Sequence, residues 1–335
     1  MKFVAGSYKQ QYNYRSFLPK PINGIELELE GKKLIAKAEE AGSGLGKLNG
    51  YSRLFPNVDW FIRMHVIKEA TTSSLIEGTK TNFNEALLPK AEILPEKKDD
   101  WQEVQNYIKA INWAVAQLPK LPLSMRLLNG AHRLLLTGVR GKFKGPGEIR
   151  RSQNWIGGNS LANAGFIPPH SDDLPNLLAD LEKFWHNREA KLPFLIKVAL
   201  AHYQFETIHP YLDGNGRIGR LLITLQLIEQ GLLSKPTLYL SEFLEKYRIE
   251  YFDSLGRVRL NNDLDQWLIF FLNGITATAK KGVLTFDKLI KLQNICRQKI
   301  NALGRKRQLG QKLLEILFDS PIIKVNRAAK DLVVT

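Results

Sequence analysis

Residues 209–220 read HPYLDGNGRIGR, a polar stretch that lies between two strongly apolar segments. The segment before it, from Pro193 to Thr207, and the segment after it, RIGRLLITLQLIEQG (217–231), both have helical patterns. The second segment is apolar nearly all round, which is typical of a helix in the middle of a helical core. The sequence therefore predicts a loop that two buried helices hold rigidly at both ends.

The second half of this loop has the residue types of an anion site. Gly214, Asn215 and Gly216 tolerate left-handed backbone angles and let main-chain N–H groups converge on an anion. They precede a helix, whose first turn already favours phosphate through its unpaired N–H groups and its dipole. Arg217 and Arg220 lie three positions apart, hence on one face of that turn, and can hold further phosphate oxygens.

The first half of the loop adds acid–base and metal chemistry. Asp213 is a hard oxygen donor suited to a Mg²⁺ ion bound to phosphate. His209 titrates near neutral pH and can accept a proton from an attacking hydroxyl, while Tyr211 anchors the loop by burying its ring. Taken singly, each residue is better explained by an ordinary turn or a solvated surface. Their order and spacing together favour a phosphate site.

The composition limits the class of protein. The chain has 335 residues, 44% hydrophobic and 24% charged, as in an ordinary globular protein. Its 48 Lys and Arg against 33 Asp and Glu give a net charge of +15, which favours anionic partners or is simply a solvated basic surface. Cys296 is the only cysteine, so an intrachain disulfide is excluded. Without an apolar leader or a membrane-spanning segment, we expect a cytoplasmic protein and no membrane partner.

Helical patterns dominate the rest of the chain, and they predict an all-α fold with a small β-hairpin. Residues 1–22 are expected to form an extended lead-in. The one clearly non-helical region is GKFKGPGEIRRSQNWIGGNSLANAGFIPPHSDDLP (141–175), in which QNWIGG and AGFIPP could be the two strands of the hairpin. We divide the chain into an N-terminal helical region (1–110), a catalytic core (111–275) and a C-terminal region (276–335). A P-loop signature and HExxH-like metal spacing are both absent from the sequence.

HPYLDGNGRIGR closely resembles the Fic (filamentation induced by cAMP) motif, HPFx[D/E]GNGRxxR, with Tyr211 in place of the usual phenylalanine. Fic proteins are mostly enzymes that move AMP from ATP onto a hydroxyl of a target protein. The resemblance implies an all-α Fic fold, Mg²⁺ as cofactor, ATP as substrate and a protein as target. It also implies the site roles: His209 as general base, Asp213 as metal ligand, and an anion site built from the remaining motif residues, Gly214, Asn215, Gly216, Arg217 and Arg220.

Two further segments are similar to parts of this family. GEIRRSQNWIGG and AGFIPP resemble its flap, a hairpin that aligns the target chain by main-chain pairing. KPTLYLSEFLEKYRIEYFDSL (235–255) resembles the helix that helps enclose the adenine. In that helix Tyr251 is the expected contact, although Tyr247 stands where the family usually has asparagine.

Residues 73–78, SSLIEG, resemble the family's inhibitory motif, [S/T]xxxE[G/N]. Ser73 and Glu77 are one helical turn apart, and Gly78 ends the helix. The resemblance implies that Glu77 pairs with Arg220 and blocks productive binding of ATP. A carboxylate at this point could also orient water for the removal of AMP from the target.

The segment GQKLLEILFDSPIIKVNRAAKDLVVT (310–335) resembles the opening of a winged-helix domain. We expect a first helix, a turn at Ser320–Pro321 and a second helix from about Asn326, with the chain stopping before a full recognition helix and wing. The basic cluster Arg305, Lys306 and Arg307 suits phosphate contact as well as it suits a solvated helix surface.

The sequence thus predicts a protein adenylyltransferase, restrained by Glu77 and able to modify itself. One alternative is a Fic enzyme that transfers another phosphate-containing group, although the kinase-like branch of the family has lysine where this chain has Gly216. The other is a DNA-binding regulator whose Fic core senses nucleotide. The sequence leaves open whether the chain forms a homodimer and whether it binds DNA.

Overall fold

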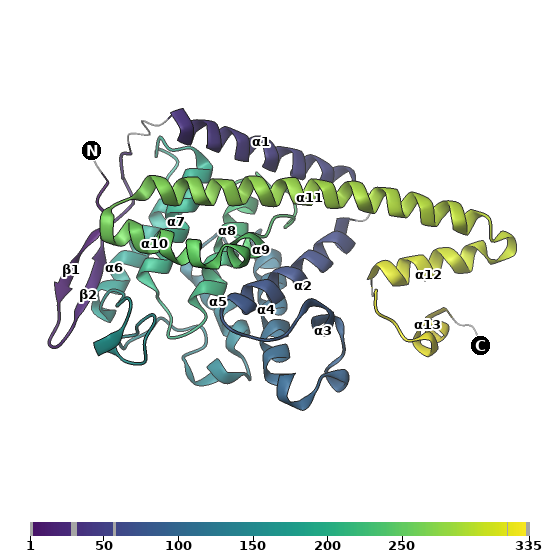
Figure 1. Cartoon of the computed structure of the whole chain (residues 1–335), viewed down its shortest axis with the longest axis horizontal. Helices are drawn as coiled ribbons and strands as arrows, with labels where there is room; N and C mark the ends of the chain where they lie inside the picture. The colour runs from purple at the N-terminus through teal and green to yellow at the C-terminus, as the bar shows by residue number, and fades with distance from the viewer. Residues whose placement is uncertain (1–2, 28–31, 56–57, 320, 333–335) are drawn as a thin grey trace.

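The computed structural model describes residues 3–27, 32–55, 58–319 and 321–332. Over these residues the protein is all-α apart from one two-stranded sheet, which confirms the predicted fold class (Figure 1). In the described ranges no helix is long and apolar enough to cross a bilayer. The helices are α1 (Lys32–Leu54), α2 (Val58–Ile76), α3 (Phe83–Leu87), α4 (Lys98–Gln117), α5 (Met125–Leu136), α6 (Leu174–His186), α7 (Phe194–Ile208), α8 (Asn215–Glu229), α9 (Ser241–Lys246), α10 (Arg248–Asn261), α11 (Leu264–Asn301), α12 (Arg307–Asp319) and α13 (Val325–Leu332).

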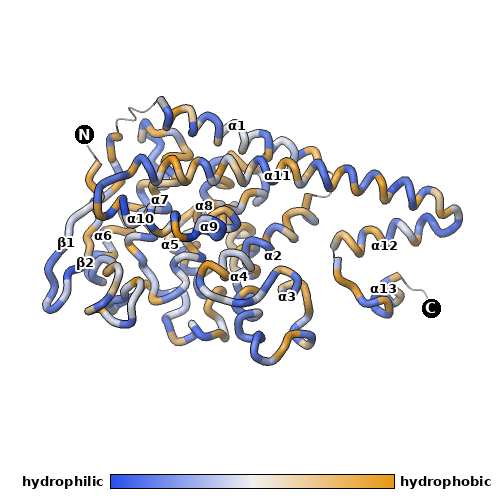
Figure 2. The backbone as a smooth tube through the Cα atoms, viewed as in Figure 1, coloured by the Kyte–Doolittle hydropathy of each residue, from blue (hydrophilic) through white to orange (hydrophobic). Residues whose placement is uncertain are grey.

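The helices α7 and α8 form the centre of the core. Every residue of α7 after Phe194 is buried, and α8 is buried from Arg217 to Leu227. The helices α2, α4 and α5 pack against α8, while α6 and α11 pack against α7. Hydrophobic colour accordingly follows α7 and α8 in Figure 2. The loop between these two helices, which carries the motif, is therefore fixed at both ends, as expected from the apolar flanks.

The helix α11 is the longest of the described helices and ties distant parts of the chain together. Its first half packs in the core through Trp267 and Phe271, and α1 lies along it. Further along, Phe286 stacks on Phe61 of α2, with ring centroids 3.8 Å apart. Beyond this point α11 projects from the core and α12 folds back beside it (Figure 1). The expected boundary at residue 275/276 falls inside this continuous helix.

The two-stranded sheet is not where the sequence predicts it. The strands β1 (Gly6–Gln10) and β2 (Arg15–Pro19) pair antiparallel in the segment that we expected to be an extended lead-in. In the expected flap, only a single antiparallel bridge joins Ile156 to Phe166. The reason is that Gly157 and Gly158 adopt left-handed angles (φ 71° and 69°) and a 3₁₀ turn follows, so few residues remain for a ladder.

The C-terminal helices lie where the sequence predicts them. The first, α12, ends at Asp319 and the second, α13, begins at Val325, while Ser320 of the expected turn lies outside the described residues. The helix α12 also contacts α2, and the rings of Phe318 and Trp60 stack with centroids 4.7 Å apart. The C-terminal region therefore rests on the helix that contains Ser73.

Candidate functional site

The motif loop is closed by a clamp between its own residues. Asn215, 2% exposed, accepts a hydrogen bond from the Tyr211 N–H through Oδ1 (2.8 Å) and donates one from Nδ2 to the Tyr211 carbonyl (2.8 Å). His209 and Gly214 both adopt left-handed angles, φ 51° and 77°. Since α8 begins at Asn215, its first unpaired N–H groups face the loop. The backbone that we expect to form the anion site is therefore already held in one conformation.

A neutral histidine supports the loop from beneath. His132 Nδ1 accepts a hydrogen bond from the Gly147 N–H (2.8 Å), so Nε2 carries the proton and donates to the Asp213 carbonyl (2.9 Å). Burial lowers the pKa of His132 to about 4, in agreement with this tautomer. The ring of Tyr211 stacks on His132 at 3.8 Å, and its hydroxyl donates to Asn129 (2.7 Å). Tyr211 is fully buried and anchors the loop, as the sequence predicts.

The flap segment holds the first half of the loop. The Arg150 guanidinium is buried and donates to the carbonyls of His209 (2.9 Å) and Pro169 (2.6 Å). Asn154 donates to the Tyr211 carbonyl (2.8 Å). Burial lowers the pKa of Arg150 to about 10, so the side chain stays charged at neutral pH. The flap is thus tied to the motif by side chains that bind its carbonyls.

His209 ends α7 with its backbone in the left-handed region. Its Nδ1 lies 3.3 Å from the Glu206 carbonyl, which can only accept, so Nδ1 carries the proton and Nε2 is left with a free lone pair. Burial lowers the pKa of His209 to about 4. The imidazole is therefore neutral at pH 7, which is the state a proton acceptor needs.

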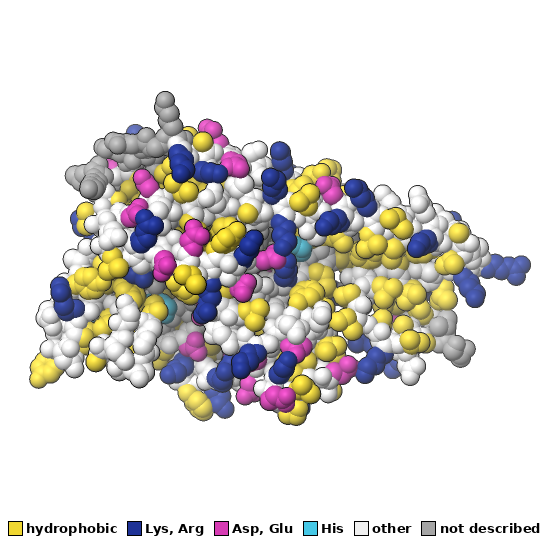
Figure 3. All heavy atoms as spheres, in the orientation of Figure 1, with side chains coloured by type: hydrophobic (Ala, Val, Ile, Leu, Met, Phe, Trp, Pro, Cys, Tyr) yellow, Lys and Arg dark blue, Asp and Glu magenta, His cyan; other side chains and the backbone are white. Residues whose placement is uncertain are grey.

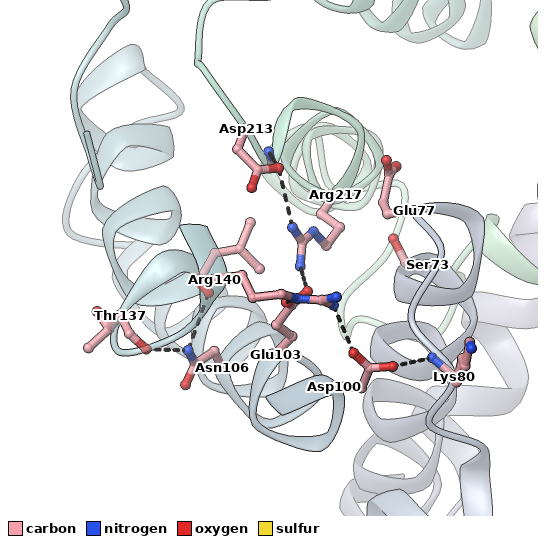
Figure 4. A network of polar contacts seen from close by, with 12 residues as sticks. Ser73, Glu77, Lys80, Asp100, Glu103, Asn106, Thr137, Arg140, Asp213 and Arg217 are labelled. Carbon is pink, nitrogen blue, oxygen red and sulfur yellow. Dashed lines mark hydrogen bonds and ion pairs between the residues drawn. The ribbon is translucent and has the colours of Figure 1, made fainter. Parts of the chain in front are cut away.

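A chain of alternating charges fixes Arg217 (Figure 4). The guanidinium, 4% exposed, donates to Glu103 (3.2 Å), and the other carboxylate oxygen of Glu103 accepts from Arg140 (2.8 Å). Arg140 in turn donates to Asp100 (2.7 Å). On its other side, Arg217 lies 3.7 Å from Asp213 Oδ1. These ion pairs hold the Arg217 side chain in place below the motif loop. Its guanidinium still carries a positive charge that is available to an anion in the loop.

Asp213 is the residue of the loop that suits a metal ion. Its side chain is 43% exposed, and Oδ1 accepts from the Gly214 N–H. Among the described residues, Oδ2 receives no hydrogen bond, so this hard oxygen donor is left without a partner. The described part of the chain holds no cluster of three or more Asp, Glu, His or Cys side chains that could hold a metal ion by themselves.

Arg220 is occupied by the end of α2. Its Nε donates to Ser73 Oγ (2.7 Å), and its Nη2 donates to the Ser73 carbonyl (3.0 Å) and to Glu77 Oε1 (2.6 Å). Burial raises the pKa of Glu77, but the charge of Arg220 outweighs burial and leaves this pKa below its ordinary value. Glu77 is therefore an anion that neutralises the buried guanidinium.

Gly216 allows this close approach, and Gly78 allows the turn that follows α2. A Cβ at position 216 would lie 2.3 Å from Glu77 Oε1 and 2.9 Å from Arg220 Nη1, so a side chain there would collide with the pair. Gly78 follows the helix with φ 95°, a conformation that favours glycine. Both glycines therefore have a geometric role, in addition to the helix stop expected for Gly78.

Tyr251 lies in the core beneath Arg220. It is 1% exposed, and its hydroxyl donates to His202 Nε2 (2.9 Å), since His202 Nδ1 donates to the Gly219 carbonyl (2.9 Å). Burial lowers the pKa of His202 to about 3, so this histidine is neutral. A contact between Tyr251 and adenine stays a prediction.

The structure brings together all the predicted motif residues with Ser73 and Glu77. Sequence reasoning did not find the residues that position them: Asn129, His132, Arg150, Asn154 and Glu103. Each lies at least 50 positions from the motif residue it contacts. Of these positioning residues, only Arg150 could have been noticed in the sequence, because it is a charged residue in a segment rich in Gly and Pro.

Comparison with known proteins defines the class to which this fold and site belong. Two family models match the chain, the Fic/DOC family N-terminal region at residues 35–116 and the Fic/DOC family at residues 122–227. The chain belongs to the Fic/DOC family.

Relatives and solved structures agree with this assignment. The chain is 36% identical over 111 residues to the protein adenylyltransferase Fic of Aedes aegypti, covering 32% of this chain and 19% of the relative. It is 36% identical over 126 residues to that of Drosophila virilis, covering 37% and 24%. The matches thus span less than a quarter of these relatives. A Fic family protein from Desulfovibrio desulfuricans G20 shares the fold, with a TM-score of 0.63, 22% identity and coverage of 76% and 75%.

Proposed function

We propose that this protein is an adenylyltransferase that moves AMP from ATP to a Ser, Thr or Tyr hydroxyl of a target protein. One observation carries the proposal: the neutral imidazole of His209 lies at one end of a loop whose other end is the start of α8, where Arg217 and Arg220 are buried. A proton acceptor beside a basic helix start suits a hydroxyl nucleophile that attacks a polyphosphate. The names of the relatives support the same activity.

In the proposed reaction the target hydroxyl oxygen attacks the α-phosphorus of ATP. The bond from this phosphorus to the pyrophosphate oxygen breaks, and pyrophosphate leaves with the electron pair. The hydroxyl proton passes to His209 Nε2, because Nδ1 is occupied by the Glu206 carbonyl. Positioning of the two reactants on a rigid loop supplies much of the rate.

The anion site would offset the charge that develops on the phosphates. The N–H groups at the start of α8 and the charge of Arg217 act without reorganisation, because the clamp of Asn215 and the ion pair with Glu103 already fix them. Asp213 would hold Mg²⁺ through Oδ2. When bound, the ion would neutralise charge on the phosphate oxygens.

The contact between Glu77 and Arg220 supports an autoinhibited resting state. Arg220 is the residue expected to hold the terminal phosphate, and it has Glu77 as a partner at 2.6 Å. The terminal phosphate of ATP would have to compete for Arg220 with the Glu77 carboxylate, which is always present because it belongs to the same chain. We therefore expect low basal activity and a large response to the removal of this carboxylate.

Transfer of label from α-labelled ATP with Mg²⁺ tests the proposal. The wild type, Glu77→Gly and Glu77→Gly/His209→Ala would be compared, with and without cell lysate, by gel and intact mass. We expect a mass gain equal to AMP in Glu77→Gly that His209→Ala abolishes. The absence of label from every folded variant, despite ATP binding, would refute AMP transfer and favour another donor or a nucleotide-sensing regulator.

A further inference from the structure

A second pocket lies far from the motif loop, where the first turn of α2, the end of α11 and α12 meet. It has a volume of about 440 Å³ and is lined by Trp60, Gln293, Arg297 and Arg307, together with residues of the same two C-terminal helices. Trp60 precedes Ser73 by 13 positions on α2, which places it about 20 Å along the helix from the inhibitory pair. The pocket is therefore not part of the site described above.

Gln293 is a mostly buried residue whose amide lines this pocket. Its residue is 5% exposed, and among the described residues its amide makes no hydrogen bond. The residue as a whole is buried, but its amide lines the pocket and is open to water or to a bound molecule there. A ligand with polar atoms would satisfy it.

The charge of the pocket favours an anion. Arg297 and Arg307 reach it from α11 and α12, and within the described part of the chain neither guanidinium has an ion pair. Glu315 is the single acid of the lining, so two cations face one anion. Arginine forks match the oxygens of a phosphate, and two of them suit a dianion better than a single carboxylate. Figure 3 shows basic side chains at the tip of this projection.

One wall of the pocket is apolar. The ring of Trp60 is held by stacking on Phe318, with an interplanar angle of 14°, and Ile300 and Leu314 lie beside it in the lining. Figure 3 shows hydrophobic side chains along the line where α11 and α12 meet. A ligand that fills the pocket would place an apolar or planar portion against this wall. A nucleic-acid duplex would not fit a pocket of this size.

We propose that this pocket binds a small organic phosphate monoester, with its dianion between Arg297 and Arg307, a polar atom on the Gln293 amide and its apolar portion against Trp60. The ligand would join α12 to the start of α2. The proposal is independent of AMP transfer, because it concerns binding to a surface that shares no residue with the motif loop.

Phenyl phosphate is a suitable first probe because it has a dianion and a planar ring but no nucleotide. Its binding to the full chain would be measured by calorimetry, with inorganic phosphate as the arm that lacks the ring. We expect saturable binding near one molecule per chain and about tenfold weaker binding of inorganic phosphate. The absence of saturable binding of either probe up to about 10 mM would overturn the proposal.

Matched variants locate the site. Arg297→Glu/Arg307→Glu is expected to weaken binding about tenfold or more, and Gln293→Leu about fivefold. Arg305→Glu/Lys306→Glu makes the same change of charge beside the pocket without touching its lining, and it should change the affinity less than twofold. If the two double variants lost affinity equally, the loss would come from the overall charge and not from the pocket. Loss of binding in Arg217→Ala would assign the probe to the motif loop. Either result would refute the proposal.

The fluorescence of Trp60 gives a second, local readout. Phenyl phosphate should change the emission of the wild type, and Trp60→Phe, which leaves the other five of the six tryptophans, should remove most of that change. An unchanged response in Trp60→Phe would place the bound probe elsewhere and contradict the proposal.

Discussion

The removal of the Glu77 carboxylate tests whether this residue restrains nucleotide binding. In the resting structure Glu77 Oε1 lies 2.6 Å from Arg220 Nη2, and the arginine side chain is only 1% exposed. Ser73 contributes two further contacts to the same guanidinium, which remain when Glu77 is changed. Glu77→Gly therefore frees one face of Arg220 without releasing its position.

The magnitude follows from the contact. A hydrogen bond to a charged group contributes about 1.5–3 kcal/mol, and a pair of charges about 4 Å apart near a protein surface interacts by about 4 kcal/mol. The Glu77 side chain is 36% exposed, so solvent screening reduces the Coulomb contribution. A net value of about 2 kcal/mol is reasonable, and it corresponds to about 30-fold in affinity for Mg-ATP.

Calorimetric titration with Mg-ATP would measure this difference. We expect Glu77→Gly to bind about 30-fold more tightly than the wild type, and Glu77→Gln to lie between them because it keeps the contact without the charge. Ser73→Ala is the control, since it removes one hydrogen bond to Arg220 but leaves Glu77 in place. If folded Glu77→Gly bound Mg-ATP within twofold of the wild type, the restraint inferred from this ion pair would be refuted.

Three further predictions concern the chemistry and the loop. Because the pKa of His209 is lowered to about 4, the transfer rate of Glu77→Gly should be flat from about pH 5.5 to 8 and fall only as the pH approaches 4; an inflection near 6.5 in the rate profile would contradict this. Arg150→Met should lower the free energy of unfolding in urea by about 3 kcal/mol, because it leaves buried carbonyls unpaired, whereas the exposed neighbour change Arg151→Met should cost less than about 0.5 kcal/mol. Asn215→Ala should cost about 3 kcal/mol in the same assay through the loss of both hydrogen bonds to Tyr211; a cost no larger than that of the exposed control Asn261→Ala would show that the clamp is not needed.

The motif loop could be predicted from sequence because its chemistry is local. Gly214 and His209 shape one short loop, and apolar segments on both sides place that loop in the core. The pairing of Glu77 with Arg220 came instead from the resemblance of SSLIEG to an inhibitory motif. Spacing alone shows only that Ser73 and Glu77 share a helix face, not which arginine they meet.

The positioning residues and the sheet could not be predicted for physical reasons. His132 and Glu103 act through contacts that span large parts of the chain, and their own surroundings are those of ordinary helices. The strand β1 is largely exposed and has no apolar alternation, and the turn after it lacks glycine and proline. Its partner β2 instead gains stability from tertiary contacts, since the Phe17 N–H donates to the Ile167 carbonyl (2.9 Å).

The absence of a side chain at Gly216 has an evolutionary consequence. A methyl group at this position and the carboxylate of Glu77 would claim the same space, although Gly216 lies in α8 and Glu77 directly follows α2. A side chain at position 216 would therefore force the ends of the Glu77 and Arg220 side chains to shift, so the residues at positions 77 and 216 influence each other. In lineages that retain the acid, position 216 should stay glycine, and a lineage that acquires a larger residue there should first have lost or displaced the acid. Covariation between these two positions would then record which descendants still carry a restrained enzyme.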